Sequence, residues 1–341
     1  MRPRNGTRPA LILAIALALS AAAPAVATAD PTPTLEKVVT PISTADAPLA
    51  ARSAGEATLS AVDYSVPEAD WTAFRDLNLL RLAHGSDPVI RHGAIDTVAR
   101  NWANYQAEND LLSTDDDVEA KLPAGIHDGV QILYWWAGDD LATFLGMLTA
   151  DLHADGATEP GFTDSGLAVV KSPYGFWAYY IVAEYTHSTP APGELPLYRF
   201  YKPSAGTHFY STSAAERNNV ISFADYRYEG LVAYINSPHA TSPTTPLRDL
   251  NRFYLPSAGT HFYTSSPEEY AAVVTYPQYS LDGVAGRVFA ASGSGLSAMH
   301  RFFRPESGTH FYSANPDEVA TVKGLPGYTY EGIGFYLRVA G

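Results

Sequence analysis

Apolar residues recur at a three-to-four-residue spacing in three segments of the first half of the chain, which is the pattern of amphipathic helices. These segments span residues 71–82, 95–112 and 141–152. Two runs rich in β-branched and aromatic residues, Gly166–Val170 and Phe176–Glu184, follow and are separated by a turn sequence. They predict a β-hairpin. Helices followed by strands indicate an α+β domain, arranged as an α-β-α sandwich.

After residue 196 the pattern becomes short, aromatic and repetitive. One motif, Arg-Phe-(Tyr/Phe) followed by Gly-Thr-His-Phe-Tyr, begins at Arg199, Arg252 and Arg301. In each copy the glycine of a later acid-Gly pair lies 31 residues after the arginine, whereas successive arginines are 53 and 49 residues apart. The repeat units are therefore modules of fixed length, and the length variation lies in the joins between them.

Each module is expected to contain a hairpin, a short helix and a second hairpin. A Pro-x-x-Gly turn joins the first two strands, and the acid-Gly pair is typical of a second tight turn. The helix begins at a capping box in each copy: Ser213 with Glu216, Ser266 with Glu269, and Asn315 with Glu318. Twelve strands in three units predict an all-β, pseudo-threefold repeat domain, β-trefoil-like with short helices. An open array of three units is the alternative.

The N-terminus has the pattern of a secretory signal peptide. Arg2, Arg4 and Arg8 precede a short apolar run at residues 11–19, and small residues lead to Ala27-Thr28-Ala29. The run is too short to span a membrane, so we expect a secreted, extracellular protein. The expected organisation is a signal peptide at 1–29, a flexible linker at 30–62, an α+β domain at 63–187, a linker at 188–196 and the repeat domain at 197–341, with modules at 197–240, 250–292 and 299–341.

The composition argues against several classes of binding partner and excludes several kinds of chemical site. The 341 residues carry a net charge of -14, and removal of the three N-terminal arginines makes it -17. Such acidity argues against binding to nucleic acid or to an anionic membrane. The absence of cysteine excludes disulfides, thiolate metal sites and thiol nucleophiles. We expect no cofactor, no bound metal, no membrane insertion and a monomeric chain.

The middle region resembles the CAP superfamily in its bacterial, SCP-like form. The resemblance rests on Leu77-Asn78 with Arg81, the helix ending at Leu111-Leu112-Ser113, Gly129–Ile132, and His153 before Phe162-Thr163. It implies an α-β-α sandwich with a His- and Glu-lined cleft. Thr114 and Val130 stand where the family motifs place a histidine and a glutamate, so the domain is expected to be degenerate and only His153 is retained as a candidate catalytic residue.

Two functions remain possible for this domain. His153 with a nearby carboxylate is the basis of a hydrolase hypothesis. Alternatively, Tyr134, Trp135 and Trp136 would line the site of an apolar-ligand carrier.

The C-terminal third resembles a bacterial tandem repeat of undefined ligand that is appended to secreted hydrolases and surface proteins. The resemblance implies an accessory module that attaches the protein to extracellular carbohydrate or a cell-wall polymer. The histidines could form a three-His metal site, or each could bond an acid of its own module. The Arg and aromatic pairs could grip a sugar or merely cover the sheet. The candidate ligand-binding residues are Arg199, Tyr201, His208, Arg252, Tyr254, His261, Arg301, Phe303 and His310.

Overall fold

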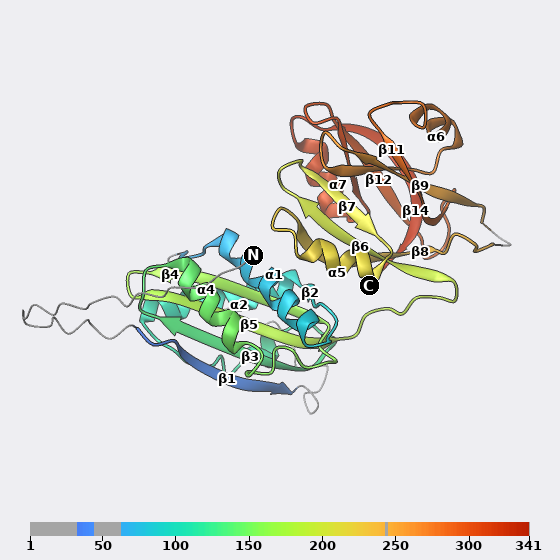
Figure 1. The fold of residues 1–341 in the computed structure, drawn as a ribbon. Coiled ribbons are helices and arrows are strands. Elements are labelled where there is room, and N and C mark those ends of the chain that lie inside the picture. Colours follow the sequence, from blue (N-terminus) through green and yellow to red (C-terminus); the bar gives the residue numbers. More distant parts are fainter. Residues whose placement is uncertain (1–32, 44–62, 243–244, 341) are drawn as a thin grey trace, which may run out of the picture. The chain divides into compact units, whose positions relative to one another are not determined.

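The structure, a computed structural model, describes residues 33–43, 63–242 and 245–340 (Figure 1). The chain is mostly β-sheet with a few helices. The expected signal peptide and most of the expected first linker lie outside the described residues. No helix in these ranges is long and apolar enough to cross a membrane.

The first region, residues 34–185, is built on a five-stranded sheet with the strand order β1-β3-β5-β4-β2. All neighbouring strands are antiparallel except β2 and β4, which are parallel. The strands are β1 (Glu36–Ser43), β2 (Ile90–Arg91), β3 (Ile126–Trp136), β4 (Asp164–Ser172) and β5 (Gly175–Tyr185), and the helices are α1 (Pro67–Ala83), α2 (Gly93–Asn109), α3 (Val118–Lys121) and α4 (Leu141–Asp151).

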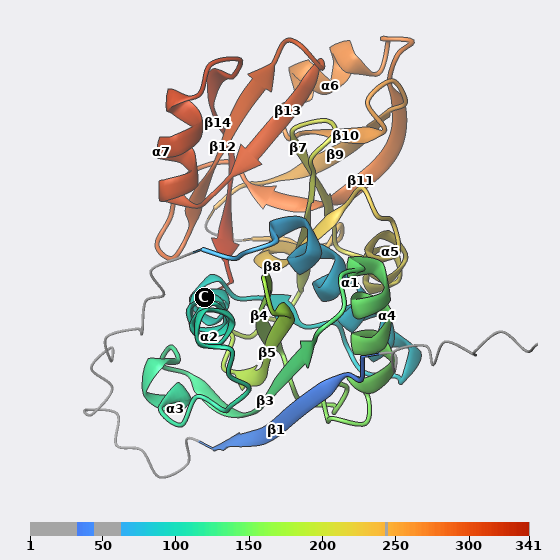
Figure 2. The same ribbon diagram turned by 90° about the vertical axis from the view of Figure 1, so that its left-hand side faces the viewer.

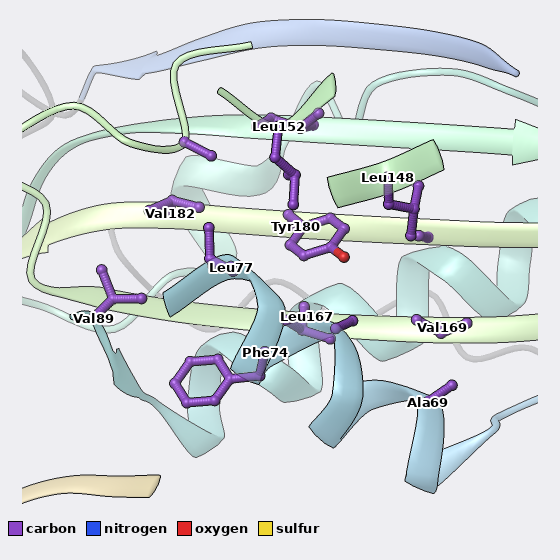
Figure 3. Close-up of a cluster of buried hydrophobic side chains, with 14 of the residues drawn as sticks. Ala69, Phe74, Leu77, Val89, Leu148, Leu152, Leu167, Val169, Tyr180 and Val182 are labelled. Carbon is purple, nitrogen blue, oxygen red and sulfur yellow. The ribbon is translucent and has the colours of Figure 1, made fainter. Parts of the chain in front are cut away.

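Helices cover both faces of this sheet (Figure 2). On one face α1 and α4 bury Phe74, Leu77 and Leu148 against alternate residues of β3, β4 and β5, such as Leu167 and Tyr180 (Figure 3). On the other face α2 packs against the intervening residues of the same strands. Strands buried on both faces are almost continuously apolar, and β5 is buried from Gly175 to Ala183. Helices therefore pack on both faces of this sheet.

The expected flexible linker at 30–62 is partly wrong, because residues 36–43 form the edge strand β1. Eight residues of β1 pair with β3 in antiparallel register. The strand is mostly exposed, contains Pro41, and buries only Ile42 completely, so its sequence lacks the strong alternation that marks a strand. Pro is tolerated there because one side of an edge strand makes no ladder hydrogen bonds.

The repeat region, residues 194–340, consists of three modules with the same order of elements, three strands with one helix before the last strand. Each module forms a three-stranded antiparallel sheet with its first strand in the centre. The modules comprise β6 (Glu194–Lys202), β7 (Thr207–Ser211), α5 (Ala214–Ile221) and β8 (Arg227–Asn236); β9 (Leu247–Leu255), β10 (Thr260–Thr264), α6 (Pro267–Val273) and β11 (Ser280–Phe289); and β12 (Ser297–Arg304), β13 (Thr309–Ser313), α7 (Pro316–Gly324) and β14 (Thr329–Val339).

The expectation of four strands per module was wrong, and the acid-Gly pair explains why. Glu229-Gly230 lies inside the continuous strand β8, where Arg199 pairs with Gly230, Phe200 pairs with Tyr228, and Glu229 is an extra residue. The same β-bulge occurs at Asp282 and Glu331. The glycines have φ of +107°, +119° and +105°, a conformation that a bulge and a tight turn can both use. β6 also begins at Glu194, inside the expected second linker.

The three modules close into a ring. Near their C-terminal ends, β8 pairs with β11, β11 with β14, and β14 with β8. Each module thus contacts both others through its last strand, which excludes an open array for these residues. One face of each module sheet packs against its own helix, as Phe200 and Phe209 do against Val220. In Figure 1 the helices α5, α6 and α7 lie on the outside of the ring.

Candidate functional site

Each module holds a cluster of one arginine, one histidine and the bulged acid, and the histidine and arginine are the candidates predicted from the sequence. In the first module Arg199 Nε lies 2.7 Å from Glu229 Oε2, and His208 Nε2 lies 3.1 Å from the same oxygen. The corresponding distances are 3.1 and 2.9 Å for Arg252 and His261 with Asp282, and 2.7 and 3.4 Å for Arg301 and His310 with Glu331. We call these the Arg–acid–His clusters.

The bulge is what brings the acid to the cluster. Side chains alternate between the two faces of a regular strand, and Gly230 is the residue that directly opposes Arg199. Glu229 would therefore point to the opposite face. The extra residue at the bulge shifts this alternation, so that the carboxylate of Glu229 meets both Arg199 and His208.

Each arginine also binds the module that precedes it around the ring. Arg252 Nη1 lies 2.8 Å from Glu216 in α5, Arg301 Nη1 lies 2.7 Å from Glu269 in α6, and Arg199 Nη1 lies 2.8 Å from Glu318 in α7. These are the glutamates of the predicted capping boxes. The N-cap side chains do accept hydrogen bonds from the glutamate N–H groups, but the carboxylates bind the neighbouring module.

Burial and neighbouring charges shift the pKa of several groups in and next to these clusters. Burial, followed by the neighbouring arginine, lowers the pKa of His261 and of His310 to about 4. Burial alone would raise the pKa of Glu229, Glu216 and Glu269, but the charges and hydrogen bonds of their arginine and histidine partners outweigh it and lower each pKa. Each guanidinium also lies within 3.1 Å of two acidic side chains, one of its own module and one of the preceding module.

The predicted candidates thus lie together within each module, where their ion pairs are made inside the protein, while Nδ1 of each of the three histidines is buried without a hydrogen-bond partner among the described residues. The alternative in which each histidine bonds an acid of its own module is confirmed. No group of three His, Asp or Glu side chains in the part of the chain that the structure describes could hold a metal ion. The aromatic candidates Tyr201, Tyr254 and Phe303 are half-buried beside the histidines, with ring centroids 5.0–5.4 Å apart.

A buried triangle of tyrosines was not expected from the sequence. Tyr210, Tyr263 and Tyr312 pack edge to face, with ring centroids 5.7–6.3 Å apart. The Tyr263 hydroxyl donates to the Tyr210 carbonyl and accepts from its N–H, and the Tyr312 hydroxyl makes the same two bonds to Tyr263. The Tyr210 hydroxyl donates to the Tyr312 carbonyl. The signal in the sequence was the final tyrosine of each His-Phe-Tyr, which lies two residues after the histidine and so on the same strand face.

Two pockets lie between modules, at equivalent positions of the ring. The pocket between the second and third modules has a volume of about 220 Å³ and is lined by Tyr263, Thr264, Ser265, Ser266, Glu269, Arg301, Tyr312, Glu331, Ile333, Gly334 and Phe335. The pocket between the third and first modules has a volume of about 360 Å³ and is lined by Arg199, Tyr210, Leu231, Val232, Ala233, Met299, Ala314, Asn315, Pro316, Val339 and Ala340. An arginine of an Arg–acid–His cluster contributes to each lining.

In the first region, the candidate His153 is exposed at the end of α4. Its Nδ1 lies 2.6 Å from Thr158 Oγ1, and its ring stacks on His84 at 3.6 Å between centroids. Among the described residues no carboxylate is hydrogen-bonded to it, so the acid required by the hydrolase hypothesis is not supplied there. Tyr134 and Trp136 of β3 are buried in the core, and Trp135 is half-buried, so these rings pack the sheet.

Arg81 and Asn78, on which the CAP resemblance partly rests, have structural contacts. The buried Arg81 guanidinium donates to the carbonyls of Asp87, Ala157, Glu159 and Phe162. Asn78 donates to the Val89 carbonyl and accepts from its N–H. Asp115, in the run Asp115-Asp116-Asp117, pairs with Lys121 at 2.5 Å.

The comparisons with known proteins identify the second half of the chain. A family model matches residues 168–248 and again residues 249–340. The first match takes in the second half of β4, all of β5 and the first module, and the second takes in nearly all of the other two modules. A search of curated proteins and a search of solved structures each found no similar protein. Because the matches cover half of the 341 residues, the chain belongs to the family described as Domain of unknown function (DUF5648).

Proposed function

We propose that the repeat region is a non-enzymatic module that binds an extracellular carbohydrate or a cell-wall polymer. The observation that supports this most directly is the pair of equivalent pockets between modules. Each combines hydrogen-bonding groups with apolar side chains, and Leu231 and Ile333 occupy equivalent places in the two linings. Sugars present the same mixture of hydroxyl groups and C–H faces, and binding sites for small ligands combine apolar walls with a few placed polar groups.

The charge distribution supports a neutral ligand. From Glu194 to Arg338 the chain carries 12 acidic and 11 basic side chains, so the acidic excess lies almost entirely before this region. Within the pockets, Arg199 and Arg301 are each paired with two carboxylates. An anionic polymer would find no unpaired positive charge there, whereas hydroxyl and carbonyl groups could still exchange hydrogen bonds.

For the rest of the chain the proposal follows the sequence. Residues 1–29 would direct export, which makes the protein secreted, and residues 63–187 would be a degenerate CAP-like domain. The layered helices around the five-stranded sheet and the buried contacts of Arg81 support that relationship. The closed ring of modules supports a pseudo-threefold architecture akin to a β-trefoil, with three strands per module instead of four.

Retention of the whole mature chain on insoluble polymers tests the binding proposal. Peptidoglycan, chitin and cellulose would be incubated with the protein and washed, and a glycan array would sample soluble sugars. We expect retention on at least one polymer. Leu231→Arg and Ile333→Arg, each of which places a bulky charge in a pocket lining, should weaken retention.

The matched control is Leu281→Arg, because Leu281 is 45% exposed on β11 and takes no part in either lining. This variant should bind like the unmodified protein. No retention on any polymer, or equal loss in all three variants, would contradict the proposed function.

A further inference from the structure

The three junctions between modules differ at one position, and that difference marks one pocket as specialised. At each junction a second β-bulge leaves a backbone carbonyl facing the neighbouring module, at Val232, Ala285 and Gly334. Thr212 donates to the Ala285 carbonyl at 3.2 Å, and Ser265 donates to the Gly334 carbonyl at 3.1 Å. These hydroxyls bridge the first–second and second–third junctions.

At the third–first junction the equivalent residue is Ala314, which has no hydroxyl. The Val232 carbonyl instead accepts from the Ala340 N–H at 3.1 Å, and Ala314, Val232 and Ala340 all line the pocket. This pocket measures about 360 Å³ against about 220 Å³ at the second–third junction. Sites that enclose small ligands are typically about 300–1,000 Å³, so the wider pocket is the one of ligand size.

The lining of the wider pocket is chemically distinct from that of the narrower one. Its walls consist mainly of apolar side chains together with Tyr210, and no carboxylate contributes to them. Its main polar groups are the guanidinium of Arg199 and the side chain of Asn315. The narrower pocket includes Glu269, Glu331 and five residues that carry hydroxyl groups, two of them tyrosines. The wider pocket therefore suits a group with an apolar part next to a hydrogen-bond acceptor.

The charge of Arg199 decides what kind of acceptor fits. Its Nε and Nη1 atoms lie 2.7 and 2.8 Å from Glu229 and Glu318, and Nη1 donates a hydrogen bond to Glu318. Because two carboxylates already surround this one positive charge, a third carboxylate would add repulsion. A neutral carbonyl oxygen can accept a hydrogen bond from an N–H group of the guanidinium without adding this repulsion, because it carries no net charge.

We propose that the pocket between the third and first modules binds the acetamido group of an N-acetylated hexosamine, with the methyl group against Ala314 and Met299 and the carbonyl oxygen toward Arg199. This inference rests on the proposed function, in that it names the sugar class that the repeat region takes. The pocket would therefore distinguish N-acetylated sugars from sugars that carry a free hydroxyl or a free amino group instead.

Titration calorimetry of the whole mature chain with three tetrasaccharides tests this assignment. The probes are N-acetylglucosamine tetramer, its fully deacetylated form, and cellotetraose. We expect the N-acetylated probe to bind at least tenfold more tightly than either of the others. Ala314→Thr, which introduces the residue type found at the equivalent position 212, should weaken its binding at least tenfold.

The matched control is Ala271→Thr, which makes the same substitution at an exposed position of α6 that contributes to neither pocket lining, and it should alter the affinity less than twofold. Equal affinity for the three probes, or an Ala314→Thr variant that binds normally, would overturn the acetamido assignment even if the protein is still retained on a polymer. Tight, Ala314-dependent binding of the N-acetylated probe without retention on any polymer would instead uphold the pocket and refute polymer attachment. If no probe binds, the assignment is also refuted.

Discussion

Removing one hydroxyl from the tyrosine triangle tests whether the ring of modules is held by its buried polar centre. Tyr263 is 2% exposed, and its hydroxyl makes a 2.7 Å bond to the Tyr210 carbonyl and a 2.9 Å bond from the Tyr210 N–H. Tyr263→Phe keeps the ring and its packing but removes both bonds. The N–H and the carbonyl of Tyr210 then lie buried without these partners.

The expected loss of stability follows from the two backbone groups of Tyr210, its N–H and its carbonyl, that lose their partner. A buried polar group left without its partner costs about 1–3 kcal/mol, so we expect Tyr263→Phe to lower the free energy of unfolding by about 2–4 kcal/mol. For a region of this size that corresponds to a fall in melting temperature of about 5–12 °C. Tyr312→Phe should cost a similar amount, because its hydroxyl makes the same pair of bonds to Tyr263.

Differential scanning calorimetry of the mature chain is the measurement, since it resolves the transition of the repeat region from other transitions. Tyr201→Phe is the control. The Tyr201 hydroxyl makes no hydrogen bond among the described residues, and the equivalent residue of the third module is already Phe303. Tyr201→Phe should change the free energy of unfolding by no more than about 0.5 kcal/mol. Equal melting temperatures for Tyr263→Phe and Tyr201→Phe would refute a structural role for the triangle.

Three further predictions concern the charged groups. Arg252→Met should lower the free energy of unfolding by about 2–3 kcal/mol. This is less than for a fully buried ion pair, because the two carboxylates that Arg252 contacts are about 30% exposed. Arg248→Met, at an exposed arginine, is the control, and equal denaturation midpoints for the two variants would contradict the prediction. Because the folded pKa of His261 and of His310 is about 4 against about 6.5 when unfolded, the unfolded state binds more protons between these values. Stability should therefore be full above about pH 7 and fall as the pH drops toward 4, and His310→Gln should show a shallower loss in melting temperature over that range; a slope equal to that of the unmodified protein would count against it. Arg81→Lys should cost about 3 kcal/mol or more in urea unfolding, because an ammonium cannot reach four separate carbonyls, and a midpoint like that of the unmodified protein would show that these contacts are dispensable.

The local structure of this chain was largely predictable, whereas the contacts that build the candidate site were not. The helix over residues 67–83 and the N-caps at Ser213, Ser266 and Asn315 follow from spacing and residue type. Glu229-Gly230 was assigned to a turn because turns and bulges require the same positive φ at glycine. Only the pairing of Arg199 with Gly230 distinguishes the two.

Contacts between residues far apart in the sequence were harder to predict than helices and strands. Glu318 is recognisable as a helix-capping residue, yet its carboxylate binds Arg199, 119 positions earlier. Nothing in the local sequence indicates that partner, because it depends on which module follows which around the ring. The strand at 36–43 was missed for a related reason, since its apolar content is low and its stability comes from pairing with β3.

Closure of the ring has a topological consequence for where the chain can begin and end. The first and last strands of the repeat region are joined by the ion pair between Glu194 and Arg338, and β14 pairs with β8 as β8 pairs with β11. A circular permutant that links position 340 to position 194 through a short linker and opens the exposed join at 291–295 would keep every one of these pairings. The position of a module along the chain is thus independent of its place in the ring. Any of the three modules could stand first in the sequence of the repeat region.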